Sequence, residues 1–400
     1  MGIVLGKKKG LFRDKLVEYD GTENVLALGS CRTGKTAGIV IPTLFKWKKS
    51  AVVIDHRSEI AEITTKAREK MGQEVIWIFP NAKDESYPHT ITSYNPLAEI
   101  RLDTEFEYGD VSDVVEILLR IEKNSERRLQ SARLLMICAV LHLLHVYKNK
   151  GNGVPTLKIL SEFILRGNEE YTLWSILNEM NHKPVYPMIP ELIVEIHKDI
   201  DMYDCEMIMQ IIGDCLKDYC TPTFAKNLES NESLIDKIIN NDSNITVYLM
   251  THSYEDYKTA PLFAIFSKQL IKRKKIEKQE EKDLLLVIDE AVVLGPLDWL
   301  EQGSIDKTGI QLLMTLQSIN QCNKMYSSAK ILEQFKIKVI TGVNDANSPM
   351  YISELSQGEL TLEDVYREKE LLLFVEGKKF QRVHKTMYWK EKVFKNYLND

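Results

Sequence analysis

The sequence lacks paired cysteines. Its six cysteines, at positions 31, 138, 205, 215, 220 and 322, are scattered, and no two of them form a Cys-x-x-Cys pair. Zinc sites and disulfide frameworks are usually visible as closely spaced cysteines. The cysteine pattern therefore argues against both kinds of site and indicates a reducing compartment.

A long apolar run is also missing. The longest one, Leu134–Tyr147, has 14 residues and contains two histidines, whereas a membrane-spanning helix needs about 20 apolar residues. The N-terminal segment MGIVLGKKKGLF has no apolar stretch of the kind found in signal peptides. The chain as given is predicted to be soluble and intracellular.

An excess of positive charge is absent as well. The chain has 52 Lys and Arg against 58 Asp and Glu, a net charge of −6, which argues against a uniformly basic DNA-coating protein. The charge is uneven, however. Residues 101–242 hold 15 basic and 24 acidic residues, a net charge of −9, and the remainder holds 37 and 34, a net charge of +3.

What the sequence does contain is a series of short apolar runs. With 400 residues the chain is long enough for two domains. Continuous apolar runs separated by helical patterns are typical of an α/β fold, with a mostly parallel central sheet covered by helices. We predict such a domain from residues 1–100 and 243–400, with an all-α domain, residues 101–242, inserted in it. The predicted strands are 24–28, 51–55, 74–79, 245–250, 284–288, 310–316, 337–341 and 371–376.

One motif has the pattern of a phosphate-binding loop. The octapeptide GSCRTGKT fits G-x-x-x-x-G-K-[ST], after a predicted strand and before a helical pattern. In this pattern backbone N–H groups turn towards phosphate, the lysine reaches the β- and γ-phosphates, and the hydroxyl ligates Mg²⁺. We therefore predict ATP and Mg²⁺ as cofactors, the alternative being a tight turn that binds nothing. The candidate binding residues are Gly29, Ser30, Cys31, Arg32, Thr33, Gly34, Lys35, Thr36 and Ala37.

Polar residues follow three other predicted strands. Asp289 and Glu290 come directly after LLLVI, and Gln317 ends IQLLMTLQ. At the carboxyl edge of a parallel sheet, such residues can hold the water shell of Mg²⁺, polarise the attacking water and contact the γ-phosphate. The alternatives are a solvated Asp-Glu pair and a glutamine that caps a loop. Asp55 and Glu59 also follow a strand, but a solvated loop and helix cap explains them equally well.

The order of the motifs carries further information. From the N-terminus the chain contains NVLALGSCRTGKT, GIVIPTL, VVIDHRSE, YNPL at 94–97, LLLVIDEAVVLGPLDWLEQG, GIQLLMTLQSINQ, TGVNDANSPMYISELSQG and LLLFVEGKKFQRVHKTMYW. In this order and over almost the whole chain, it resembles the type IV coupling proteins of bacterial conjugation and type IV secretion, the TraG/TraD-type ATPases.

The resemblance implies a RecA-like motor domain with an inserted all-α domain. It also implies an ATPase at the cytoplasmic face of the membrane that acts as a hexamer and recruits DNA–relaxase complexes or protein effectors to a secretion channel. By matching position, Lys35 and Thr36 serve phosphate and Mg²⁺, Asp289 serves Mg²⁺, Glu290 is the catalytic carboxylate and Gln317 is the γ-phosphate sensor. We expect the acidic inserted domain to dock a relaxase, an accessory factor or an effector, because its net charge suits phosphate backbones poorly. DNA remains a candidate partner.

The sequence departs from the family pattern in three places. No membrane helices precede the first predicted strand, so we expect a soluble form that reaches the membrane through partners or through an anchor missing from this sequence. Ser304–Gly309 has no arginine where the family often has one that reaches a neighbouring subunit, and Lys307 lacks the planar fork of arginine. The family's Asp-Pro-Lys-Gly-Glu appears as Asp55-His56-Arg57-Ser58-Glu59.

Two other functions stay open. The same fold could serve a DNA translocase or helicase of another system. The missing arginine also leaves room for a nucleotide-gated docking platform with negligible turnover. The sequence does not distinguish DNA cargo from protein cargo.

Overall fold

The protein is described here from a computed structural model in which the chain forms two compact units. The α/β unit comprises residues 1–78, 238–260 and 270–400, and the helical unit comprises 79–237 and 261–269. The described residues are 2–10, 14–82, 87–120, 126–166, 172–199, 202–240, 243–252, 256–277, 284–326, 330–367 and 369–398.

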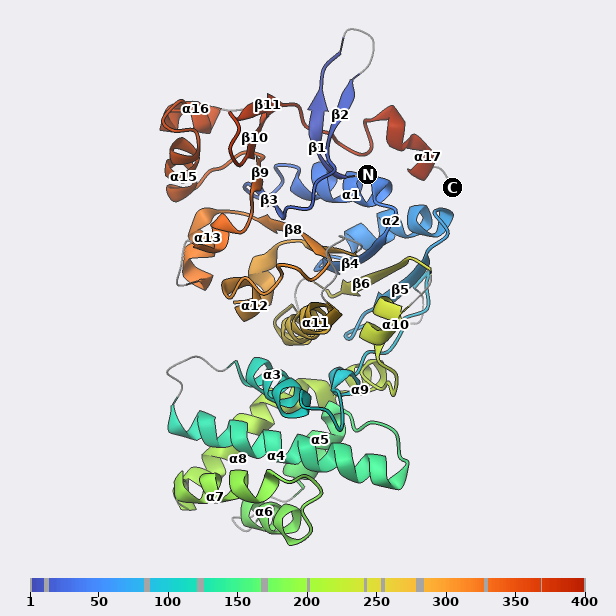
Figure 1. Cartoon of the computed structure of the whole chain (residues 1–400), viewed down its shortest axis with the longest axis vertical. Coiled ribbons are helices and arrows are strands. Elements are labelled where there is room, and N and C mark those ends of the chain that lie inside the picture. The colour runs from blue at the N-terminus through green and yellow to red at the C-terminus, as the bar shows by residue number, and fades with distance from the viewer. Residues whose placement is uncertain are drawn as a thin grey trace. The chain divides into compact units, whose positions relative to one another are not determined.

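Within the described residues, the α/β unit contains a nine-stranded sheet in the order β11-β10-β9-β3-β8-β7-β4-β6-β5 (Figure 1). The strands from β9 to β5 are parallel, and β10 is antiparallel to both of its neighbours. The strand bounds are Val25–Leu28 (β3), Ser50–Asp55 (β4), Glu74–Ile78 (β5), Ile245–Met250 (β6), Leu284–Ile288 (β7), Ile310–Leu316 (β8), Ile337–Ile340 (β9), Leu371–Val375 (β10) and Gln381–Val383 (β11).

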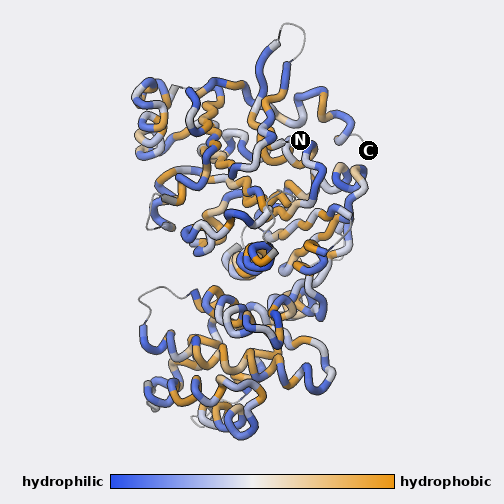
Figure 2. Tube along the Cα trace, in the orientation of Figure 1, coloured by the Kyte–Doolittle hydropathy of each residue, from blue (hydrophilic) through white to orange (hydrophobic). Residues whose placement is uncertain are grey.

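The strand prediction is confirmed for β3 to β10. In β6, β7 and β8 every residue is buried, because a parallel sheet covered on both faces needs apolar side chains at all strand positions. Figure 2 shows these apolar segments along the central strands. The helices of this unit include η1 and α1 (Thr36–Val40, Ile41–Lys46), α2 (Glu59–Lys70), α12 (Asp298–Glu301), α13 (Ile319–Met325), α14 (Lys330–Glu333), α15 (Asn347–Leu355), α16 (Leu362–Arg367) and α17 (Lys395–Leu398).

A hairpin at the N-terminus was not predicted. Strands β1 (Ile3–Lys8) and β2 (Lys15–Tyr19) pair antiparallel in a separate sheet, with an irregularity at Gly6, whose φ is +136°. The Val4 N–H donates to the Thr43 hydroxyl of α1 at 3.0 Å. Lys7 exchanges backbone hydrogen bonds with His384 at 2.9 and 2.8 Å. The hairpin thus joins the N-terminus to helix α1 and to the C-terminal segment.

The helical unit is built around one long helix. Helix α4 (Arg127–Lys150) has 24 residues. It is the one helix in the described part of the chain that could cross a membrane by length and composition, but 78% of its apolar window is buried inside the protein, as in the core helix of a soluble domain. The other helices are α3 (Glu107–Leu119), α5 (Leu157–Ile164), α6 (Thr172–His182), α7 (Ile189–Asp199), α8 (Met202–Leu216), α9 (Pro222–Asn227) and α10 (Leu234–Asn240). Helix α11 (Asp256–Glu277) contributes residues to both units.

Asn95 ties the two ends of the helical segment together. Its amide donates to the carbonyls of Pro155 and Ser230 at 3.1 Å, and its side-chain oxygen accepts from the Leu97 N–H at 3.0 Å. Four residues on, the buried Glu99 carboxylate accepts from the Leu234 N–H at 2.7 Å and so caps α10. These bonds explain why residues 79–100, which we expected in the α/β domain, belong to the helical unit.

Candidate nucleotide-binding site

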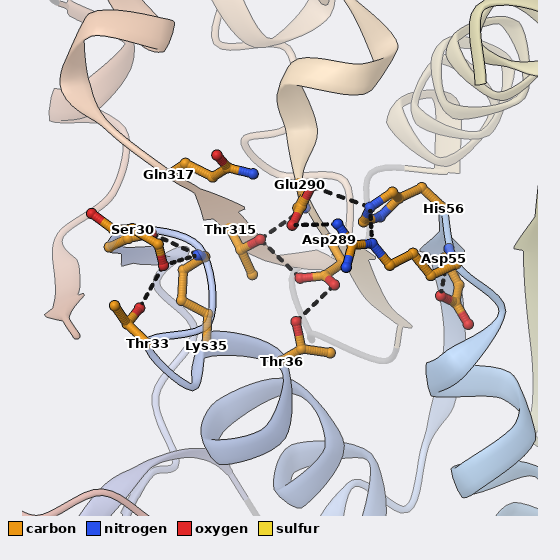
Figure 3. A network of polar contacts seen from close by, with 12 residues as sticks. Ser30, Thr33, Lys35, Thr36, Asp55, His56, Asp289, Glu290, Thr315 and Gln317 are labelled. Atoms are coloured by element: carbon orange, nitrogen blue, oxygen red, sulfur yellow. Dashed lines mark hydrogen bonds and ion pairs between the residues drawn. The ribbon is translucent and has the colours of Figure 1, made fainter. Parts of the chain in front are cut away.

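The phosphate-binding loop begins where β3 ends and closes around the lysine of its own motif. Lys35 is only 5% exposed, and its ammonium donates to the carbonyls of Gly29 at 2.6 Å and Ser30 at 3.1 Å (Figure 3). The Thr33 hydroxyl donates to the same Ser30 carbonyl at 2.7 Å. Burial lowers the pKa of Lys35, and the negative charges of Asp289 and Glu290 oppose that effect.

The segment that follows the neighbouring strand β9 holds the loop in this shape. The Ser30 N–H donates to the Gly342 carbonyl at 2.8 Å, and the Ser30 hydroxyl donates to Asn344 Oδ1 at 2.5 Å. A Cβ at Gly29 would lie 2.0 Å from the Thr341 hydroxyl oxygen, so this position needs glycine. We did not assign Thr341 and Asn344 to the site from the sequence, although Thr341 ends a predicted strand and Asn344 lies just beyond it.

The C-terminal segment packs against the helix that follows the loop. The Tyr388 N–H donates to the Ala37 carbonyl at 3.1 Å, and a Cβ at Gly38 would meet the Thr386 carbonyl at 3.0 Å. Further along the helix, Phe45 stacks on Tyr397 with ring centroids 5.0 Å apart. The first turn of the helix is therefore fixed by backbone contacts from a segment about 350 residues later in the chain.

Asp289 lies beside Thr36. The Thr36 hydroxyl donates to Asp289 Oδ2 at 2.9 Å, and the Thr315 hydroxyl donates to Oδ1 at 2.8 Å. Burial raises the pKa of Asp289, and these two hydrogen bonds oppose the rise. A hydroxyl and a carboxylate in contact form the kind of oxygen donor set that Mg²⁺ prefers. Thr315 was missed because it lies inside a buried strand, where threonine is common for packing alone.

Glu290 follows in a left-handed backbone conformation, with φ of 53° and ψ of 59°. Its N–H donates to the Thr315 hydroxyl at 2.8 Å. Its carboxylate lies 3.1 Å from His56 Nε2 and 4.0 Å from the Arg57 guanidinium. The hydrogen bond with His56 is the largest cause of a lowered pKa of Glu290. The glutamate is therefore present as a carboxylate at neutral pH.

Asp55 has a structural role in the turn between β4 and α2. Its carboxylate accepts from the Ala61 N–H at 2.8 Å and from the Arg57 N–H at 3.3 Å, so it fixes the turn between β4 and α2. Burial raises the pKa of Asp55 to about 7. Glu59 is exposed in the first turn of α2. The helix-cap alternative thus describes Asp55, and neither carboxylate contacts the loop residues in the described structure.

Gln317 directly follows β8 and lies on the same sheet edge as Lys35 and Glu290 (Figure 3). Its backbone N–H donates to Gln321 Oε1 at 3.2 Å. By contrast, Lys307 precedes β8 and so lies at the opposite edge from the phosphate-binding loop of its own chain. Its side chain is exposed, and its φ is 59°.

The candidate residues therefore meet at one edge of the sheet. Residues 2–370 match the family model described as Type IV secretory system Conjugative DNA transfer. The chain belongs to this family. Among curated proteins, it is 25% identical over 327 residues to the conjugal transfer protein TraG of Escherichia coli. The matched region covers 76% of this chain and 50% of TraG. It is also 25% identical over 342 residues to VirD4 of Agrobacterium fabrum, covering 82% and 48%. The chain thus spans about half the length of the curated relatives it matches.

Two solved structures share the fold. The conjugative coupling protein TrwBdeltaN70 superposes with a TM-score of 0.67 at 14% sequence identity, over 93% of this chain and 86% of that chain. VirB4 of Thermoanaerobacter pseudethanolicus gives 0.54 at 17% identity over 96% of both chains. The predicted fold class, a RecA-like domain with a mostly parallel central sheet flanked by helices and an additional all-α domain, is confirmed.

Proposed function

We propose that the α/β unit binds and hydrolyses ATP with Mg²⁺, and that the chain uses this energy as a coupling protein of a conjugation or type IV secretion system. The observation that carries the proposal is the meeting of Thr36 and Asp289 at 2.9 Å, with Lys35, Glu290 and Gln317 on the same sheet edge. A phosphate-binding loop is joined there to the carboxylates that hydrolysis requires.

Each residue has a role that its position supports. Lys35 would exchange its loop carbonyls for the β- and γ-phosphates, and Thr36 with Asp289 would hold Mg²⁺. When bound there, Mg²⁺ neutralises charge on the phosphate oxygens. The Glu290 carboxylate would polarise the attacking water, and the Gln317 amide would contact the γ-phosphate. Solved complexes of TrwB with ADP and Mg²⁺ and with a non-hydrolysable ATP analogue support this choice of ligands.

The helical unit is the proposed docking surface for cargo. Residues 101–242 carry a net charge of −9, which repels nucleic-acid phosphates and suits a basic protein surface. We propose a relaxase, a relaxosome accessory protein or a secreted effector as the partner, with DNA handled by the α/β unit. The assembly would be a homohexamer at the cytoplasmic face of the bacterial membrane, in contact with secretion-channel proteins.

A second candidate function follows from the segment Ser304–Gly309. It offers Lys307 in place of an arginine that could act on the nucleotide of a neighbouring subunit. Lysine forms no bidentate contact with phosphate, so the chain could bind ATP and change shape while turning it over negligibly.

Binding and turnover separate the two functions. Nucleotide affinity is measured with a fluorescent ATP analogue, and turnover by phosphate release, for the wild type and for Lys35→Ala. The ATPase proposal expects Lys35→Ala to lose both activities. Tight binding by a wild type that releases no phosphate, with or without DNA, would favour the docking platform. Undiminished turnover in Lys35→Ala would place the reaction elsewhere.

A further inference from the structure

One nitrogen atom at the site has two competing partners. His56 Nε2 lies 3.1 Å from Glu290 Oε2 and 3.0 Å from Arg57 Nε. A neutral imidazole nitrogen either carries a proton, which it can donate to the carboxylate, or a lone pair, which can accept from the guanidinium. His56 Nε2 therefore serves Glu290 or Arg57, but not both at the same time.

The order of the strands in the sheet shows in which direction a bond to His56 moves the Glu290 carboxylate. From the phosphate-binding loop the strands run β3, β8, β7 and β4. Glu290 follows β7, and His56 follows β4 on the side remote from β3. A bond to His56 therefore draws the carboxylate away from the phosphate-binding loop. The Glu290 N–H is fixed by Thr315 at 2.8 Å, so the change of partner falls on the side chain.

The two competing groups differ in mobility. His56 is 5% exposed and stands on a turn that Asp55 fixes through the Ala61 and Arg57 N–H groups. The Arg57 side chain is 53% exposed, and its other contact in the described structure is the 4.0 Å approach to Glu290. The histidine is thus a fixed anchor, whereas the arginine is free to move towards or away from it.

We propose that His56 and Arg57 are positioning residues for Glu290. When His56 donates to Glu290, the carboxylate is held on the β4 side, and when Arg57 occupies His56 Nε2, the carboxylate is released towards the nucleotide. This inference rests on the proposed ATP hydrolysis. It assigns a function to His56 and Arg57, two of the three positions at which the chain departs from the Asp-Pro-Lys-Gly-Glu pattern.

The proposal predicts changes of opposite sign. His56→Ala removes the anchor, so kcat for ATP hydrolysis without any partner should rise, by about threefold or more. Arg57→Ala removes the competitor and leaves Glu290 held, so kcat should fall by about tenfold. In both variants the dissociation constant for ADP should change less than about twofold, because the hydrogen bonds and ion pairs given above for His56 and Arg57 in the described structure do not involve the loop. His56→Phe fills the same space without a nitrogen and serves as a second variant if His56→Ala folds poorly.

The double variant decides whether Arg57 acts through His56. If it does, His56→Ala combined with Arg57→Ala should behave like His56→Ala alone, with kcat above the wild type. A double variant as slow as Arg57→Ala would show that the arginine acts directly on the nucleotide and would overturn the proposal. Equal losses in both single variants, or no change in either, would also overturn it. Lys48→Ala, an exposed lysine on the loop before β4, is the control for loss of positive charge.

The same measurements distinguish this inference from the proposed function. A wild type that releases no phosphate would contradict ATP hydrolysis itself. If the wild type hydrolyses ATP, Lys35→Ala abolishes this activity and the His56 and Arg57 variants keep the wild-type kcat, only the positioning role is contradicted.

Discussion

The Thr315 hydroxyl donates to Asp289 Oδ1 at 2.8 Å from inside strand β8. The Thr315 hydroxyl oxygen also accepts from the Glu290 N–H at 2.8 Å. One buried threonine therefore fixes the orientation of the proposed metal ligand and the backbone of the proposed catalytic glutamate. Burial raises the pKa of Asp289, and the donated hydrogen bond counteracts that rise.

Thr315→Val tests this relationship, because valine keeps the shape of the side chain and removes the hydroxyl. We expect kcat for ATP hydrolysis to fall by about tenfold, and the Mg²⁺ concentration for half-maximal rate to rise, since an orienting hydrogen bond is lost. Thr315→Ser keeps the hydroxyl and should stay close to the wild type. A valine variant with the kcat and Mg²⁺ requirement of the wild type would contradict the assigned role.

The pKa of Asp55 predicts a pH dependence of stability. Burial raises this pKa to about 7, above the ordinary value of about 4 for an aspartate. Between these two values the folded state binds the proton more tightly than the unfolded state. The free energy of unfolding therefore falls as the pH rises through this window.

Thermal unfolding between pH 5 and pH 8 checks this sign. Asp55→Asn cannot titrate at this position, so its melting temperature should fall less than that of the wild type as the pH rises. Glu62→Gln removes an exposed carboxylate of α2 and is the matched control. Parallel pH profiles for wild type and Asp55→Asn would contradict the raised pKa.

Asn95 should determine the stability of the helical unit. Asn95→Ala leaves the buried carbonyl of Pro155 and the carbonyl of Ser230 without this donor, which should cost about 1 to 3 kcal/mol. We expect faster proteolysis within residues 79–237, measured by limited digestion and mass spectrometry. Asn181→Ala, at an exposed position in the last turn of α6, should have no effect. Equal rates of digestion for the two variants would contradict a role of Asn95 in the stability of the helical unit.

Helix α7 offers a test of the proposed docking surface. Glu191, Val194 and Glu195 are exposed and share one helix face by their spacing, with Val194 53% exposed. Glu191→Lys with Glu195→Lys should weaken binding of a purified relaxase or effector by about tenfold, since each reversed charge repels a basic partner. The control is Glu62→Lys in the α/β unit. Unchanged affinity of the α7 variant for the relaxase or effector would exclude this helix face as the docking surface.

The sequence predicted those parts of the structure that depend on neighbouring residues. Strands β6, β7 and β8 agree with their predicted bounds because each is a continuous apolar run. The phosphate-binding loop was also recognisable, because the residues of its motif are consecutive in the sequence. The meeting of Thr36 and Asp289 followed from the rule that parallel strands bring their carboxyl ends to one edge.

The rest depends on contacts between distant residues. Asn95 binds carbonyls 60 and 135 residues away, so its place in the helical unit had no local signal. Hairpin β1–β2 was missed because Gly6 and the lysines around it break the alternation of apolar and polar residues that is typical of a half-buried strand. Burial of His56 depends on the pairing of β4 with β7, which no single segment encodes.

Single-turnover and steady-state phosphate release by the purified chain, with Glu290→Gln beside the wild type, tests the central claim most directly. Exchange of the carboxylate for an amide keeps the size of the side chain and removes its charge. The account predicts Mg²⁺-dependent ATP hydrolysis by the wild type, and a Glu290→Gln variant that binds ATP with similar affinity but hydrolyses it at least about a hundredfold more slowly. Hydrolysis at the wild-type rate by Glu290→Gln, or by the wild type without Mg²⁺, would contradict it.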